Sequence, residues 1–273
     1  MRYSDGVANY EDYVSFLNLF SEFDYNEVKE EFEFVYLRSE EKLNIIKEKY
    51  DYQKYKVDGS SFKTMVRLMV WVFDSLLGDG MCYPPPQFNT EIVLDKTKSQ
   101  NLYSNCYMYA TVLNEIYLSM GFVSRMVRCM PIDLAYSDCH CVVEAYCPEY
   151  QKWVVFDAAN KAYYTSKHMI PLNLFELRET IRINQQVIVP MMARSETKKL
   201  IEYFVKNLIR FESYKVSRYG NEYYWDNRTM YHFQSKNYPV SDKEIYYRDY
   251  DCTIKHVHTS NPNLFWKTPI LMR

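Results

Sequence analysis

The chain has 273 residues, 48% of them hydrophobic and 25% charged, which is enough for one large domain with a substantial buried core. Its net charge of −2 and its pI of about 6.2 lack the basic excess of proteins that bind nucleic acids or anionic membranes. We therefore expect neither nucleic acid nor a membrane as a partner.

The seven cysteines are scattered without the spacing of a disulfide framework, which is typical of a reducing compartment in which thiols stay free. The first thirty residues contain several acidic side chains and no basic stretch followed by an apolar run, so they do not resemble a signal peptide. We expect a cytoplasmic protein, and secretion through a signal peptide that has been removed stays open.

The N-terminal part predicts amphipathic helices. Residues 10–23 place four apolar side chains on one helical face, and residues 26–50 continue with apolar positions at helical spacing. Acidic residues dominate here, whereas a helix on a membrane surface is rich in Lys and Arg. We expect these helices to pack on the core. The four side chains of the first face are Tyr13, Phe16, Leu17 and Phe20.

A turn over residues 58–61 precedes a strongly apolar helix that is expected to end at Gly78. Trp71 lies on this helix and is a candidate for the border of a functional cleft, although core packing is the commoner role of such a residue. The predicted buried stripe consists of Val66, Met69, Val70, Phe73 and Leu77.

Cys106 opens the segment NCYMYATVLNEIYLSMGF, whose apolar residues recur at helical spacing until Gly121. Gly121 favours the left-handed conformation that ends a helix. Cys106 then lies in the first turn, where free amide N–H groups and the positive end of the helix dipole lower the pKa of a thiol. A nucleophilic cysteine would be placed here, whereas Cys106 taken alone would more often be a buried structural thiol.

Two β-rich runs, HCVVEAY and WVVFD, flank a four-residue loop and predict an antiparallel hairpin. If Tyr146 lies opposite Gln151, His140 faces Asp157 directly. A register shift by two residues would leave the pair diagonal on the same face. A carboxylate beside an imidazole holds the ring in one tautomer, so these residues and Cys106 predict a nucleophile, a base and an orienting acid.

This order, with the cysteine starting a helix and the other two residues on consecutive strands, is similar to the transglutaminase-like superfamily, which shares a papain-like catalytic core. The resemblance covers about residues 60–180. Bacterial transglutaminase-like proteins resemble this chain also in the run that follows the aspartate. The matching residues are Asn105–Cys106, Ala110–Glu115, Met120–Phe122, Ser124–Arg125, Cys139–His140, Trp153–Asn160 and Ala162–Tyr163.

The resemblance implies that Cys106 is the nucleophile, His140 the general base and Asp157 the orienting acid. Asn160 is a supporting candidate that would brace the turn after Asp157. Asn105 stands beside the cysteine where the family often has Gly or Gln, so the oxyanion donor beyond the backbone N–H of Cys106 stays open. Trp71 would correspond to a recurring tryptophan of the family.

The expected fold is α+β, with a papain/transglutaminase-like core in which the catalytic helix packs on an antiparallel sheet. Residues 1–57 are expected to form a helical segment that packs on the core, residues 58–185 the catalytic core, and residues 186–273 an α/β extension that completes the same domain. In that extension, KKLIEYFVKNLIRFE predicts one helix, with Leu200, Phe204, Leu208 and Phe211 in register.

Neither a metal nor a cofactor is predicted. The cysteines around His140 lack the CxxC spacing of a structural zinc site, and strand alternation turns Cys139 and Cys141 away from that imidazole. His256 and His258 share a strand face without a further ligand in a motif, so we expect two surface histidines. No phosphate-binding loop, dinucleotide fingerprint or EF-hand loop is present in the sequence.

The favoured function is a thiol-dependent enzyme that forms a thioester from an amide of a peptide or protein substrate. Release of the acyl group to water would make it a peptidase or amidase, and we favour this outcome. Release to an amine would make it a transglutaminase. A binding scaffold that keeps the fold without turnover is the alternative class, against which the intact Cys106, His140 and Asp157 weigh. The oligomeric state is not predicted.

Overall fold

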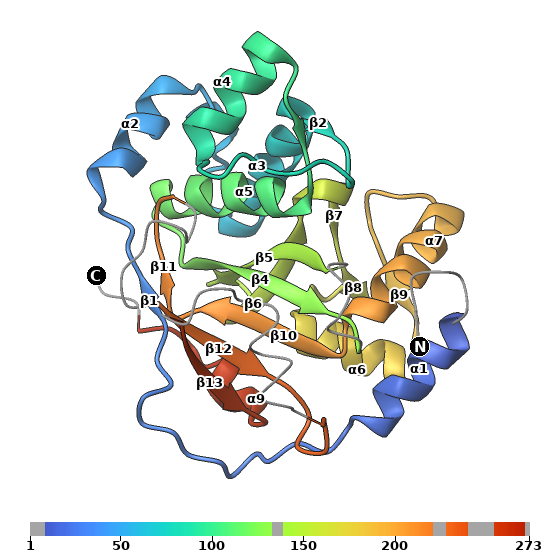
Figure 1. The fold of residues 1–273 in the computed structure, drawn as a ribbon. Coiled ribbons are helices and arrows are strands. Elements are labelled where there is room, and N and C mark those ends of the chain that lie inside the picture. Colours follow the sequence, from blue (N-terminus) through green and yellow to red (C-terminus); the bar gives the residue numbers. More distant parts are fainter. Residues whose placement is uncertain (1–8, 133–138, 221–227, 240–253, 271–273) are drawn as a thin grey trace.

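The computed structural model describes residues 9–132, 139–220, 228–239 and 254–270 (Figure 1). A seven-stranded sheet with the order β13-β12-β10-β4-β5-β6-β7 runs through the middle of the molecule. The α+β class is confirmed, but the sheet is mixed, because β12 and β13 pair in parallel while the other neighbours are antiparallel. Its strands are β4 (Ser124–Met130), β5 (His140–Cys147), β6 (Lys152–Asp157), β7 (Ala162–Tyr163), β10 (Arg210–Tyr214), β12 (Thr229–Phe233) and β13 (Lys255–Thr259).

Helices cover both faces of this sheet, so the molecule has three layers (Figure 1). On one face, α5 (Cys106–Ser119) packs on β4 and β5, and three further helices pack around it. Almost every residue of α5 after its first turn is buried, which makes it the central helix of this layer. The helices around it are α2 (Glu41–Lys49), α3 (Ser61–Ser75) and α4 (Thr90–Gln100).

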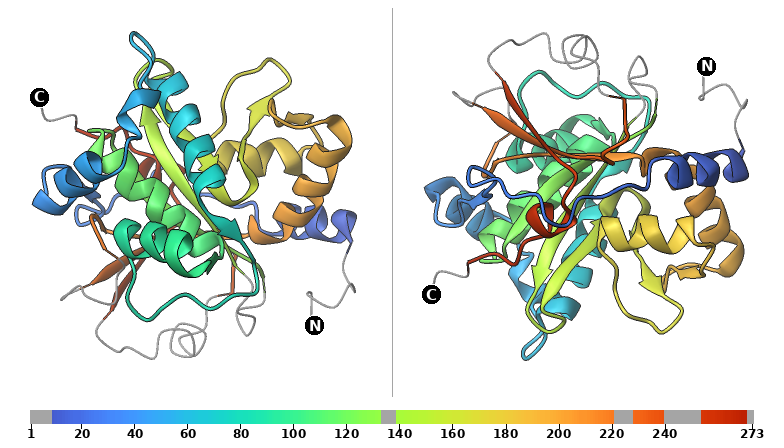
Figure 2. Two further views of the ribbon diagram at one scale, coloured as in Figure 1. Left: turned by 90° about the horizontal axis from the view of Figure 1, so that it is seen from above. Right: turned by 90° about the horizontal axis from the view of Figure 1, so that it is seen from below.

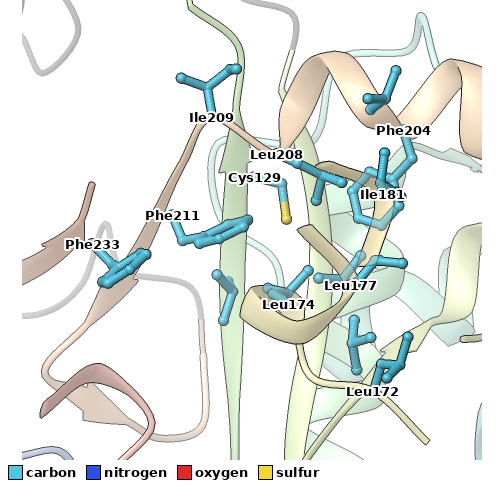
Figure 3. Packing of buried hydrophobic residues seen from close by; sticks show 14 of the residues in the cluster. Cys129, Leu172, Leu174, Leu177, Ile181, Phe204, Leu208, Ile209, Phe211 and Phe233 are labelled. Atoms are coloured by element: carbon cyan, nitrogen blue, oxygen red, sulfur yellow. The ribbon is translucent and has the colours of Figure 1, made fainter. Parts of the chain in front are cut away.

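The opposite face is covered by α1 (Tyr10–Leu19), α6 (Leu174–Arg182) and α7 (Arg194–Phe204). Leu174, Leu177 and Ile181 of α6 recur at helical spacing and pack with Phe204 of α7 and the sheet residues Cys129 and Phe211 (Figure 3). Alternate residues of β5 and β6 therefore belong to two different cores. The short helices are η2 (Gln53–Tyr55), η3 (Ala158–Asn160), η4 (Val205–Asn207) and α9 (Pro262–Phe265).

Three pairs of short strands complete the described part of the chain. They are β1 (Val35–Tyr36) with β11 (Val216–Ser217), β2 (Leu77–Gly78) with β3 (Tyr103–Ser104), and β8 (Thr165–Ser166) with β9 (Val187–Ile188). The segment between α1 and α2 crosses beneath the sheet and carries β1 (Figure 2). The helix predicted over residues 26–50 therefore exists only as α2. Before α2 the chain is extended, and Phe32 and Phe34 pack in the core on the side of the sheet that α1, α6 and α7 cover.

The helix predicted to end at Gly78 ends at Ser75, and the chain continues into β2. Its buried face is also rotated with respect to the prediction. Met69 is buried as expected, whereas Val66, Val70 and Phe73 are half-buried and Leu77 is exposed. The fully buried positions are Thr64, Met65, Leu68, Met69 and Val72, because α5 and the sheet contact the helix on that side.

The C-terminal strands join the main sheet. Strand β10 pairs with β4, and β12 and β13 extend the sheet beyond it. The helix predicted from KKLIEYFVKNLIRFE ends as α7 at Phe204, and Phe211 lies on β10 with its ring stacked on Phe233. Apolar residues at helical spacing thus span a helix, a 3₁₀ turn and a strand. The boundaries 1–57, 58–185 and 186–273 stay a prediction.

Candidate active site

Cys106 is the first residue of α5, as predicted. Asn105 caps the helix, because its side-chain oxygen accepts a hydrogen bond from the Met108 N–H at 3.2 Å. At the other end, Gly121 has a φ of 84°, the left-handed conformation expected of it. The half-buried Cys106 thiol therefore lies at the amino end of the central helix, with its Sγ 3.8 Å from the Cys139 carbonyl oxygen.

His140 begins β5 and Asp157 ends β6, but the hairpin register differs from the predicted one. Tyr146 pairs with Trp153 instead of Gln151, a shift of two residues. Gln151 has a φ of 51° and belongs to the turn, where its N–H donates to the Pro148 carbonyl at 3.2 Å. His140 and Asp157 are therefore diagonal neighbours on one face, and the imidazole Nε2 lies 2.8 Å from the carboxylate Oδ2.

The Asp157 carboxylate is fully buried and accepts hydrogen bonds from three side chains and one backbone N–H. Besides His140, the Asn160 side-chain amide donates at 2.9 Å and the Tyr164 hydroxyl at 3.1 Å, both to Oδ2. The Asn160 backbone N–H donates to Oδ1 at 3.2 Å. Asn160 thus braces the turn after Asp157 as expected. Tyr164 was not anticipated from the sequence, which contains no signal for it among so many tyrosines.

The His140 imidazole is enclosed by protein. It is 2% exposed, and the rings of Tyr203 and Phe204 from α7 pack edge-on against it at centroid distances of 5.7 and 5.1 Å. Its Nδ1 has no hydrogen-bond partner of standard geometry among the described residues. Since Nε2 is taken by Asp157, Nδ1 is the nitrogen left for the thiol of Cys106.

Charge stabilises this group of residues in its ionised form. The hydrogen bond from the Cys141 thiol and the neighbouring His140 imidazole hold the pKa of Cys106 well below its usual range, although burial acts in the opposite direction. Burial would lower the pKa of His140, but the Asp157 carboxylate and the Cys106 thiolate raise it well above 6.5. Burial would raise the pKa of Asp157, yet the His140 charge and three hydrogen-bond donors lower it. A thiolate and imidazolium pair is the favoured state.

Cys141 is the further contributor that the sequence did not identify. Strand alternation turns it away from His140, as predicted, and this same alternation points it toward α5 and Cys106. Its own pKa is raised well above the usual value by hydrogen bonding with Cys106. The opposite directions of the two pKa shifts favour a proton on Cys141 and a thiolate on Cys106.

The other two supporting candidates have structural contacts. The Asn105 amide group donates to the Cys82 carbonyl at 3.1 Å while its oxygen caps α5, so both ends of this side chain are engaged. Trp71 packs against Tyr52, with ring centroids 5.4 Å apart, in the core formed by α3 and α5. These contacts match the core role that is commoner for such a tryptophan.

His256 and His258, which were predicted to lie on the surface, are half-buried and lie beside His232. His232 of β12 is 2% exposed, its Nε2 lies 2.8 Å from His256 Nδ1, and its ring stacks on that of His258 at 4.4 Å. The parallel pairing of β12 with β13 brings them together, which spacing within one strand could not reveal. Within the described residues, no group of three or more His, Cys, Asp or Glu side chains could hold a metal ion.

None of the helices in the described part of the chain is long and apolar enough to cross a membrane. No protein-family model and no curated protein matches the sequence. Among solved structures, a "Putative Cysteine Protease from Cytophaga hutchinsonii" is similar, with 14% sequence identity and a TM-score of 0.34. The match covers 43% of this chain and 37% of that protein, well under two thirds of its length. A likeness of this extent establishes neither the family nor the function of this chain.

Proposed function

We propose that this protein is a cysteine-dependent acyl-transfer enzyme that cleaves amide bonds through a thioester on Cys106. The observation that carries the proposal is the His140 imidazole, which is fixed by Asp157 at 2.8 Å through Nε2 while its Nδ1 is left for a thiol at a helix amino end. A nucleophile, a base and an orienting acid are the parts that this chemistry requires.

In the first half of the reaction, the Cys106 thiolate attacks the amide carbonyl carbon and a C–S bond forms. The negative charge moves to the carbonyl oxygen, near the amino end of α5, where the Cys106 backbone N–H is a candidate donor. The imidazolium of His140 then gives its proton to the departing nitrogen as the C–N bond breaks. A thioester and a free amine result.

In the second half, His140 takes a proton from water as the water oxygen attacks the thioester carbonyl carbon. The C–S bond breaks, the acid is released, and the thiolate and imidazolium pair is restored. An amine in place of water would give a new amide through the same steps, so the acyl acceptor decides between hydrolysis and transamidation. The participation of peptides and proteins as substrates is part of this proposal.

An activated ester tests the thioester directly. With p-nitrophenyl acetate, we expect a burst of nitrophenol that matches the enzyme concentration, followed by slower turnover, and mass spectrometry of the quenched protein should find one acetyl group on the peptide that contains Cys106. Cys106→Ala should abolish both signals, while Cys147→Ala, which changes a buried cysteine at the other end of β5, should retain them. A burst that survives Cys106→Ala would refute the proposal.

A further inference from the structure

A cavity with a volume of about 470 Å³ lies beside the candidate active site, between α7 and the end of α3. This volume is within the range of about 300–1,000 Å³ that is common for pockets that bind small organic groups. Its apolar lining is supplied by Phe73, Met191, Met192, Leu200 and Tyr203. Two of these residues lie on α7 and two in the loop before it, outside the part of the chain that resembles a known family.

Two lining residues connect the cavity to the catalytic histidine. Asn160 lines it and donates to Asp157 at 2.9 Å, with its amide nitrogen 3.4 Å from His140 Nε2. Tyr203 lines it and packs its ring against that of His140. The cavity therefore borders the Nε2 side of the imidazole, whereas Nδ1 is the atom left for Cys106.

The direction of proton transfer indicates which part of a substrate reaches this cavity. His140 gives its proton to the departing nitrogen from Nδ1, so the leaving part of the substrate lies beside the imidazole, and a side chain on that part reaches the cavity by extending along the ring toward Asn160 and Tyr203. The acyl part is held by Cys106 during the same step. A cavity built against His140 from α7 is thus on the leaving-amine side of the reacting carbonyl.

The lining favours an apolar group. The charge of Lys161 is engaged by Asp74 at 2.8 Å and lies over the Phe73 ring, 5.0 Å from its centroid. Lys199 is matched by the opposite charge of Glu196 in the same lining. Methionine side chains adapt to ligands of different shape, and both Met191 and Met192 are half-buried.

We propose that this cavity is a specificity subsite that binds an apolar side chain on the leaving-amine side of the scissile amide. The inference rests on the proposed acyl-transfer function and adds the class of substrate: amides whose amine part carries a bulky aliphatic or aromatic side chain. Met191, Met192 and Leu200 are the specificity-determining residues, and none of them takes part in the chemistry.

The subsite can be tested by letting different amines compete with water for the acyl group on Cys106. An attacking amine occupies the position of the leaving amine, so its side chain should enter the same subsite. The protein is acetylated with p-nitrophenyl acetate in the presence of glycinamide, leucinamide or phenylalaninamide, and the acetylated amide is measured against acetate. In each transfer the amine nitrogen attacks the thioester carbonyl, the C–S bond breaks and His140 takes the amine proton. We expect leucinamide and phenylalaninamide to capture the acetyl group at least about tenfold better than glycinamide.

Substitutions that fill the cavity should remove this preference. Met191→Trp is expected to bring the ratio of phenylalaninamide to glycinamide capture toward one, and Lys199→Trp at the rim serves if the first variant does not fold. Lys198→Trp, on the same helix but outside the cavity, should retain the wild-type ratio. A wild-type ratio near one, with acetyl-Cys106 formed normally, would overturn the subsite alone. Absence of acetyl-Cys106 would overturn the proposed function and the subsite with it.

Discussion

His140 and Asp157 meet across a diagonal of the β5–β6 hairpin, with 2.8 Å between Nε2 and Oδ2. This contact fixes the ring in the tautomer that carries its proton on Nε2 when neutral, and so leaves Nδ1 as the basic nitrogen. In Asp157→Asn the charge is lost and the amide can reverse this preference. We expect the rate of Cys106 alkylation at neutral pH to fall by roughly a hundredfold or more. An unchanged rate would exclude Asp157 as the orienting acid.

The hydrogen bond from Cys141 is expected to stabilise the Cys106 thiolate. A hydrogen bond to a charged group contributes about 1.5–3 kcal/mol, which corresponds to roughly one to two pH units in the pKa of the acceptor. Cys141→Ala should therefore move the pH profile of Cys106 alkylation to higher pH by this amount. Cys141→Ser keeps a donor and should stay closer to the wild-type profile. Equal profiles for all three proteins would contradict this role.

The same pair of charges predicts a bell-shaped pH dependence of acylation. Because the pKa of Cys106 is lowered and that of His140 is raised, the thiolate and imidazolium pair exists between the two values. Activity should rise as pH increases through the lower value and fall as pH increases through the upper one. His140→Ala should remove the fall in activity at high pH. It should also move the midpoint of the rise at low pH upward, toward the pKa of an ordinary thiol, about 8.5.

The Tyr164 hydroxyl stabilises the buried Asp157 carboxylate. Tyr164→Phe leaves that carboxylate with one donor fewer, and we expect a loss of about 1–3 kcal/mol in the free energy of unfolding at pH 7. The pKa of Asp157 is lowered by folding, so its stabilisation is present above its unfolded pKa and is lost as pH falls. The difference between wild type and Tyr164→Phe should therefore shrink in acid. Denaturant titrations at pH 7 and pH 3 measure it, with the neighbouring half-buried Tyr163→Phe as the control.

A buried ion pair connects the sheet to the end of the described chain. Arg125 and Glu144, on neighbouring strands, are 2.9 Å apart and almost inaccessible to solvent, and Arg125 also donates to the Phe265 carbonyl at 2.8 Å. Arg125→Met would leave the Glu144 carboxylate buried without its partner, and we expect a loss of about 3–5 kcal/mol in stability. Arg182→Met, which removes a half-buried surface pair with Glu179, should cost at most about 1 kcal/mol.

The elements near the site could be predicted because local signals determine them. The apolar spacing after Cys106, Gly121 and the two β-rich runs each act within a few residues, and α5, β5 and β6 appear where they were expected. The hairpin register could not be fixed, because the left-handed conformation of Gln151 decides it and Gln carries no preference for that conformation. His140 and Asp157 are nevertheless neighbours on one face of the hairpin, because a register shift by two residues keeps side chains on the same face.

What the sequence concealed depends on contacts between distant segments. Tyr203 and Phe204 reach His140 from α7, more than sixty positions along the chain, and Tyr164 reaches Asp157 through the fold of the loop that follows β7. The histidine cluster of β12 and β13 results from a parallel pairing that no local pattern encodes. The helix predicted from apolar spacing also ran past the end of α7 into β10, because a buried strand and a buried helix segment can share the same composition.

The most direct test is limited alkylation of the folded protein with iodoacetamide at pH 6, followed by peptide mapping of all seven cysteines. A thiol with an ordinary pKa of about 8.5 is well under 1% thiolate at this pH, so only a stabilised thiolate reacts quickly. We expect Cys106 to be modified first and by a wide margin, and His140→Ala to remove this selectivity. If Cys106 reacts no faster than Cys82 or Cys252 in the wild-type protein, it is not the nucleophile, and the acyl-transfer function proposed here is wrong.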